Sequence, residues 1–170
     1  MKERISNNLR KWFSLIIAIF LYYVIHEGSH MIIAMLYGAF IKIRILGLGV
    51  QVVANTEPLS DFQTAIFCVV GSISTLLVAY LLVLLTKKIV KIKNKIIKAI
   101  CYYTTIAFLL LDPLYLTIGY KFVGGGDMNG ILLFGIPEII IQIIFAIVSI
   151  INIFLIIKKI YPAYKKSFSK

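Results

Sequence analysis

Residues 12–37 read WFSLIIAIFLYYVIHEGSHMIIAMLY, an almost uninterrupted apolar run with a short polar motif in its second half. A helix needs about 20 apolar residues to cross a bilayer, so this stretch is long enough to span one. Its basic start resembles a signal peptide, but no small-residue cleavage site follows and the apolar run continues past His26. We therefore expect a retained membrane-spanning helix.

The composition of the whole chain also indicates a membrane protein. Of its 170 residues, 61% are hydrophobic and 15% are charged, whereas soluble domains are about 45–50% apolar and about 25% charged. This excludes disorder, an ordinary cytosolic enzyme and a nucleic-acid-binding domain. Further spans are predicted at 65–85, 99–120 and 131–157, the last with a bend at Pro137. The predicted fold is an all-α integral membrane protein, a single membrane-embedded domain over residues 1–170.

The positive charge predicts the orientation of these spans. The net charge is +11, from 18 Lys and Arg against 7 Asp and Glu. Most of the cationic residues lie before the first predicted span (Lys2, Arg4, Arg10, Lys11), between the second and third (Lys87, Lys88, Lys91, Lys93, Lys95, Lys98) or after the fourth (Lys158, Lys159, Lys165, Lys166, Lys170). Only Lys42, Arg44 and Lys121 fall on the other side. The positive-inside rule then predicts a multi-pass protein of the cell membrane with cytoplasmic termini. Anionic lipid headgroups, and not nucleic acid, explain the charge.

Residues 40–54, between the first two predicted spans, follow a different pattern. Ile41, Ile43 and Ile45 alternate with Lys42 and Arg44, which is the two-residue period of a β-strand. Gly47 and Gly49 allow a turn before a second β-branched run. We expect a short β-hairpin that lies on the membrane or dips into it. An irregular interfacial loop is the alternative.

The polar motif of the first span is His26-Glu27-Gly28-Ser29-His30, an H-E-x-x-H sequence. Residues i and i+4 share one face of a helix, so both imidazoles can reach one metal ion. Glu27 is placed to take a proton from water at that ion, as in zinc hydrolases. These are the only two histidines of the chain, and ionisable residues inside a membrane helix usually mark function. The alternative is a polar cluster that joins helices.

A catalytic zinc ion has three protein ligands, so one more is needed. Cys68 and Cys101 lie in apolar runs and read as small buried hydrophobes. Asp127 is the favoured ligand, because it lies in the Gly-rich segment 124–130 near the start of the fourth predicted span. An aspartate there also suits a helix cap.

Three other polar residues remain candidates for a role at the site. Asp112 precedes Pro113 in the third predicted span and is an alternative ligand, a helix breaker or a partner that holds a ligand in place. Glu138 is a weaker choice of ligand. Asn129 could donate to a substrate carbonyl or form a turn.

The chain resembles the site-2 protease family of intramembrane zinc metalloproteases over roughly residues 20–150. The resemblance rests on His26-Glu27-Gly28-Ser29-His30 and on Gly125-Gly126-Asp127-Met128-Asn129-Gly130. It implies that His26, His30 and Asp127 bind zinc, that Glu27 activates water, and that the hairpin guides an extended substrate.

The sequence departs from that family in three respects. The prolines usual around the aspartate are absent, and Leu111-Asp112-Pro113 is a partial competitor for its position. A Gly-Pro pair usual in the helix after the hairpin is Gly71-Ser72 here. The site of the family opens toward the cytoplasm, whereas the charges of this chain place it near the outer face.

The predicted function is zinc-dependent hydrolysis of peptide bonds in membrane-inserted or membrane-associated protein substrates. The partners would be such a protein or peptide and the lipid bilayer, without nucleic acid. One alternative is a non-catalytic metal-binding membrane protein with an immunity or sequestering role. Another is a metal transporter, which should carry further ligands along several helices.

Overall fold

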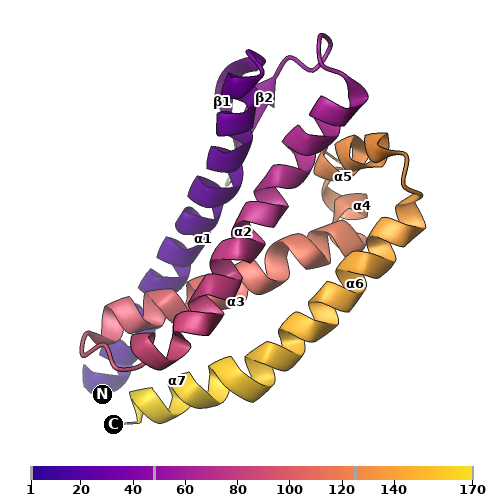
Figure 1. Cartoon of the computed structure of the whole chain (residues 1–170). Coiled ribbons are helices and arrows are strands. Elements are labelled where there is room, and N and C mark those ends of the chain that lie inside the picture. Colours follow the sequence, from indigo (N-terminus) through magenta and orange to yellow (C-terminus); the bar gives the residue numbers. More distant parts are fainter. Residues whose placement is uncertain (1, 48, 125, 170) are drawn as a thin grey trace.

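The computed structural model describes residues 2–47, 49–124 and 126–169. It contains four helices that are long and apolar enough to cross a membrane: Asn7–Leu36, Asp61–Ile89, Lys95–Val123 and Glu138–Phe168. A two-stranded antiparallel hairpin follows the first of them. Figure 1 shows the helices as one bundle with the hairpin at one end.

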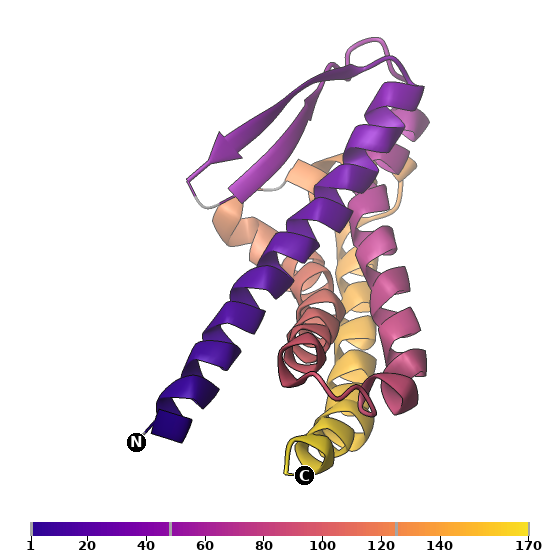
Figure 2. The ribbon, with the colours of Figure 1, turned by 90° about the vertical axis from the view of Figure 1, so that its left-hand side faces the viewer.

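Helices α1 (Lys2–Leu36), α2 (Asp61–Ile89) and α3 (Lys95–Leu114) pack against one another in pairs, and α6 (Glu138–Leu155) packs against α3. Both termini and the turn between α2 and α3 lie at the end opposite the hairpin (Figure 2). The bundle therefore has one end that carries the hairpin and another that carries most of the lysines.

Capping residues determine where two of the helices begin. At the start of α2, Gln63 N–H donates to Ser60 Oγ at 3.2 Å and Ser60 N–H donates to Gln63 Oε1 at 3.0 Å, a reciprocal capping box. At the start of α3, Asn94 Oδ1 accepts from the N–H groups of Ile96 and Ile97. Both caps satisfy backbone donors that the helix itself leaves free.

The predicted β-hairpin is confirmed. Strand β1 (Phe40–Leu46) pairs with β2 (Gly49–Ala54), and Ile43 lies opposite Val52. Val52 is 6% exposed, and β2 contacts α1. The hairpin thus lies beside the half of α1 that carries the H-E-x-x-H motif.

The prediction that Asp112-Pro113 might break the third span is wrong. Helix α3 runs through Pro113 into a π-helical turn at Tyr115–Gly119 and then into α4 (Tyr120–Val123). Pro113 cannot donate the backbone hydrogen bond of a regular α-helix. The carbonyl that this leaves free, Leu109 O, accepts a hydrogen bond of 2.7 Å from Asn152 Nδ2 instead, and the helix continues.

The fourth span begins later than the predicted 131–157. Residues before it form a separate short helix, α5 (Gly126–Ile131), and a 3₁₀ turn at Leu132–Phe134. Gly135 then adopts a φ of 75°, and Pro137 is the N-cap residue of α6. Helix α6 continues through a π-helical turn at Ile156–Ile160 into α7 (Tyr161–Phe168). Pro137 therefore marks the beginning of the helix and does not bend it, because proline fits where no N–H is needed.

The buried apolar side chains form two clusters. One joins α2, α3 and the end of the fourth span, and its largest buried side chains are Phe108, Leu109 and Tyr164. The other lies at the hairpin end and contains Met128 and Ile131 of α5. This second cluster anchors the short helix that carries Asp127.

Candidate metal centre

His26 and His30 lie one helical turn apart on the face of α1 that points into the bundle. Their exposed fractions are 6% and 3%. The two Nε2 atoms are 3.1 Å apart, so both imidazoles present the same ring nitrogen to one point, as the i and i+4 spacing predicts.

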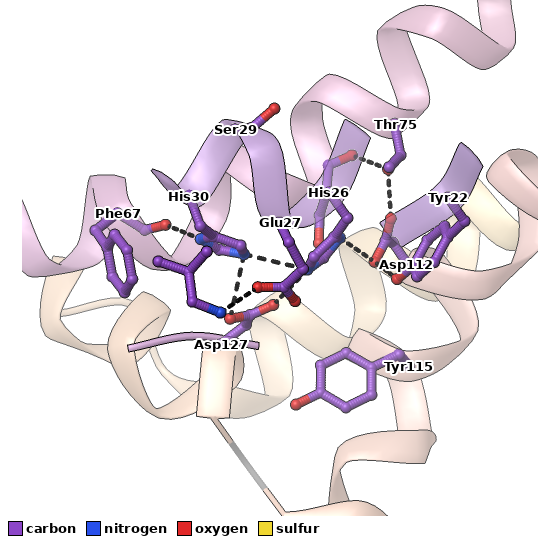
Figure 3. A network of polar contacts seen from close by, with 12 residues as sticks. Tyr22, His26, Glu27, Ser29, His30, Phe67, Thr75, Asp112, Tyr115 and Asp127 are labelled. Carbon is purple, nitrogen blue, oxygen red and sulfur yellow. Dashed lines mark hydrogen bonds and ion pairs between the residues drawn. The ribbon is translucent and has the colours of Figure 1, made fainter. Parts of the chain in front are cut away.

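Asp127 reaches this point from α5, 101 residues further along the chain. Its Oδ2 lies 3.2 Å from His26 Nε2 and its Oδ1 lies 3.7 Å from His30 Nε2 (Figure 3). Burial by itself would raise the pKa of this carboxyl group, but the contacts with His26 and His30 outweigh burial and lower its pKa below the ordinary value. The carboxylate is therefore held in its ionised form beside the imidazoles.

The spacing of these three side chains fits a zinc ion. Tetrahedral coordination with bonds of about 2.0–2.1 Å places ligand atoms about 3.3 Å apart. The nitrogen and oxygen atoms of His26, His30 and Asp127 lie within 4.8 Å of one another, and three of their separations are 3.1, 3.2 and 3.7 Å. Among the residues that the structure describes, no other trio of His, Cys, Asp or Glu side chains is grouped in this way.

The far side of the His30 ring is occupied by a backbone carbonyl. His30 Nδ1 lies 2.6 Å from the oxygen of Phe67 on α2. Because a carbonyl oxygen only accepts, Nδ1 must carry the proton, and the lone pair of Nε2 then faces His26 and Asp127. This is the tautomer that a metal ligand requires.

Asp112 lies against the corresponding side of the His26 ring. Its Oδ1 lies 3.2 Å from His26 Nδ1, an ion-pair contact whose geometry falls outside that of a hydrogen bond. The side chain is fully buried. It accepts a hydrogen bond from Tyr22 OH at 2.6 Å and a short one from Thr75 Oγ1. Asp112 therefore contacts the back of a ligand and lies outside the trio (Figure 3).

Glu27 is held by the hairpin. Its Oε2 accepts a hydrogen bond of 2.7 Å from the backbone N–H of Val52 on β2. Figure 3 shows its carboxylate on the same side of α1 as Asp127. One oxygen is thereby fixed, while Oε1 makes no hydrogen bond to the part of the chain that the structure describes.

An apolar groove of about 480 Å³ lies between α1 and the hairpin, and Glu27 is one of its lining residues. The rest of the lining is almost entirely hydrophobic and includes Phe20, Val24, Met31, Ile43 and Val50. The groove thus places a half-buried carboxylate beside an apolar surface.

Two glycines allow the helices to approach closely enough to form the trio. A Cβ atom at Gly71 of α2 would lie 2.5 Å from His30 Nε2 and 2.8 Å from His26 Nε2. A Cβ atom at Gly130 of α5 would lie 2.1 Å from Cys68 Sγ. Both distances are far below van der Waals contact, so any larger residue would displace a neighbour.

The structure brings together His26, His30 and Asp127 but not the other candidates. Glu138 receives a short hydrogen bond from Tyr120 OH and lies 3.7 Å from Lys121 Nζ, outside the cluster. Asn129 is exposed on α5. Gly125, which belongs to the motif used for the family resemblance, lies outside the described residues. Residues 126–130, whose glycines predict a flexible turn, are helical instead.

The sequence did not indicate Tyr22, Phe67, Gly71, Thr75 or Val52 as parts of the site. Only Gly71 carried a signal, as the remaining half of a Gly-Pro pair. The others act through a backbone atom or through a buried hydroxyl group, and their type and spacing are ordinary for an apolar helix or strand.

Comparisons of this chain with protein-family models, with curated proteins and with solved structures found no match.

Proposed function

We propose that this chain is a zinc-dependent intramembrane peptidase, of the kind found in the site-2 protease family. It spans the cell membrane four times with both termini in the cytoplasm. Four long apolar helices and the grouping of the lysines support this orientation. The observation that carries the proposal is the convergence of His26 Nε2, His30 Nε2 and Asp127, with an oxygen atom next to the other nitrogen of each ring.

His26, His30 and Asp127 would hold the zinc ion. When bound, the ion would supply Lewis-acid chemistry, polarising a scissile carbonyl and lowering the pKa of water. These three side chains carry one negative charge in total, so a divalent ion held by them would keep a net positive charge.

Glu27 is the general base. As the oxygen of water bonds to the carbonyl carbon, Glu27 accepts the proton that this water loses. It then returns the proton to the nitrogen as the C–N bond breaks, which leaves a carboxylic acid and an amine. The hydrogen bond from Val52 N–H keeps one oxygen of Glu27 in place during both transfers.

The groove between α1 and the hairpin suits an apolar segment of a membrane protein. Glu27 is the one charged residue of its lining, so a segment bound there would lie beside the base. A substrate strand paired with the hairpin would be extended, and an extended strand exposes the peptide bond that a helix conceals.

The test uses Glu27→Gln, with Ser29→Ala as the matched control. Ser29 lies in the same motif, but its hydroxyl group donates to Ile25 O within α1. Loss of a general base typically lowers the rate by about 10²–10⁴-fold. We expect purified Glu27→Gln to hold one equivalent of zinc. In cells, membrane proteins should gain new N-termini with the parent and with Ser29→Ala, but not with Glu27→Gln.

Equal numbers of new N-termini with Glu27→Gln and with the parent would show that the mechanism is wrong. A parent that binds zinc but produces no new N-termini in any membrane tested would favour the non-catalytic metal-binding alternative. If the purified parent held less than one equivalent of zinc, the assignment of the metal site would be wrong.

A further inference from the structure

A second cavity lies at the end of the bundle opposite the hairpin. Its volume is about 580 Å³, within the range of small-molecule sites. It is formed where α2 ends, where α3 begins and where α7 passes beside them (Figure 1). We call it the basic cavity, because Lys91, Lys93, Lys95, Lys98 and Lys166 line it together with Val90, Ile92, Ala163 and Ser167.

The basic cavity has a charge that the described protein does not neutralise. Five lysines line it and no acidic residue does. The one ion pair between a lysine and an acidic residue in the described part of the chain joins Lys121 to Glu138, on other elements. An anion in the cavity would therefore meet only positive charge.

Lys98 is the residue that distinguishes this cavity from a solvated basic surface. It is 5% exposed, and its Nζ donates to two neutral acceptors, Ser167 Oγ at 2.6 Å and Ser167 O at 3.3 Å. Ser167 Oγ in turn donates to Val90 O. The ring of Phe168 also lies 5.3 Å from Nζ, so the ammonium group has only neutral partners in the described part of the chain.

The positive-inside rule explains why lysines are frequent at this end, but it does not explain a buried one. Exposed lysines are sufficient to orient a membrane protein. A buried ammonium group loses its hydration and is usually paired with an anion. Its position against the cavity indicates that the anion comes from outside the chain.

The level of the cavity along the bundle indicates the source of the anion. Ile96 and Ile97 lie beside the cavity lysines on α3 and are 45% and 47% exposed, so this helix turns apolar side chains outward next to its basic residues. Apolar exposure adjoining lysines is typical of the boundary between acyl chains and headgroups.

We propose that the basic cavity binds the phosphate of an anionic phospholipid headgroup, with Lys98 at its buried side and Lys93, Lys95 and Lys166 around it. The site is separate from the metal centre and does not depend on the proposed peptidase activity. A headgroup that also carries a cation, such as phosphocholine, is disfavoured because the same lysines repel it.

The test measures binding of short-chain lipids to the purified full chain in a neutral detergent. The ligands are dioctanoyl phosphatidylglycerol, dioctanoyl phosphatidylcholine and inorganic phosphate. The cavity variant is Lys93→Gln/Lys95→Gln/Lys166→Gln. The control variant, Lys88→Gln/Lys158→Gln/Lys159→Gln, has the same net charge and changes lysines that do not line the cavity. All six side chains are exposed, so both variants should fold.

We expect the parent to bind phosphatidylglycerol at least tenfold more tightly than either phosphatidylcholine or phosphate. The cavity variant should lose at least tenfold in affinity, since a lysine near an anionic surface contributes about fivefold, and the control variant less than threefold. Equal losses in both variants would indicate diffuse charge and overturn the proposal. Phosphate that binds as tightly as phosphatidylglycerol would indicate a site for the free ion and overturn the lipid proposal. Equal affinity for phosphatidylglycerol and phosphatidylcholine would show that the cavity does not select an anionic headgroup.

Discussion

Each histidine of the trio has an oxygen atom next to the ring nitrogen that faces away from Asp127. His30 donates to the carbonyl of Phe67, and His26 faces the carboxylate of Asp112. An acceptor behind an imidazole sets its tautomer and its orientation and makes the other nitrogen a better ligand. At the scale of single residues, the hydrogen bond of His30 to Phe67 O and the ion-pair contact of His26 with Asp112 support the H-E-x-x-H motif as a candidate metal site.

Asp112 should affect zinc affinity without being a ligand. Asp112→Asn keeps the shape of the side chain and removes its charge, so we expect the variant to bind one equivalent of zinc about 10–100-fold more weakly. Asp127→Asn should lose stoichiometric zinc. Zinc titration with a competing chelator measures both. If Asp112→Asn lost the stoichiometric zinc ion and Asp127→Asn kept it, Asp112 would be the ligand and Asp127 would not.

Gly71 should be required for metal binding because of the space it leaves. The Cβ of Gly71→Ala would lie 2.5 Å from His30 Nε2, so the imidazoles must move apart and the zinc affinity should fall by at least tenfold. Gly28→Ala is the matched control, since a Cβ there meets nothing within 4 Å. Zinc content and a far-ultraviolet helix signal measure both variants. Unchanged affinity in Gly71→Ala would mean that α2 does not pack against the histidines in this way.

At the scale of elements, the short helix α5 is the least secured part of the site. It has only six residues, Gly126–Ile131, too few for a helix to be stable alone. Its position depends on the burial of Met128 and Ile131 and on the close approach of Gly130 to α2. The position of Asp127 relative to the two histidines therefore depends on how α5 packs against α2.

Gly130→Ala should therefore displace Asp127. The new Cβ would lie 2.1 Å from Cys68 Sγ and 2.6 Å from Cys68 Cβ, so α5 must move away from α2. We expect at least a tenfold loss of zinc affinity together with a destabilisation of about 1–3 kcal/mol, typical of overpacking. Gly126→Ala on the same helix meets nothing within 4 Å and should bind zinc as the parent does.

A second substitution tests whether the contact itself is responsible. Cys68→Gly removes both atoms that the new Cβ of Gly130→Ala would meet, so the double variant should regain part of the lost zinc affinity. If it regains none, the effect of Gly130→Ala does not arise from this contact.

The hairpin contributes through its register. Val52 N–H can reach Glu27 only because it points away from β1. Since side chains and N–H groups alternate along a strand, a slip of one residue would turn this donor toward β1 and leave Glu27 without it.

At the scale of the whole molecule, a metal ion would link the first helix to a segment near the start of the fourth span. His26 and Asp127 are 101 residues apart in the chain. A ligand that binds only the folded state stabilises it by about 2.7 kcal/mol when its concentration is 100 times its Kd. The chelated protein should therefore melt several degrees below the zinc-loaded protein.

Thermal unfolding in detergent measures this difference, with Asp127→Ala as the control. The control should melt at the same temperature with zinc or with chelator, because it lacks one of the three ligands. An equal zinc-dependent shift in Asp127→Ala would place the stabilising ion elsewhere on the chain.

The amino-acid sequence alone was sufficient to predict what depends on neighbouring residues. Four apolar segments, the alternation of residues 41–45 and the spacing of His26 and His30 are local patterns, and the structure contains the corresponding helices, hairpin and pair of imidazoles. Asp127 was predicted to join the histidines from its residue type and its place in the chain, and the structure places it there.

Only the tertiary structure decided which groups contact His26, Glu27 and His30 from other parts of the chain. The carbonyl of Phe67, the hydroxyl groups of Tyr22 and Thr75, the N–H of Val52 and the absent side chain of Gly71 act through contacts between distant segments. A backbone carbonyl or N–H is present at almost every position, so the sequence carries no sign of which one will face an imidazole or a carboxylate. The packing of α2, α5 and the hairpin against α1 determines which of these backbone groups face the site.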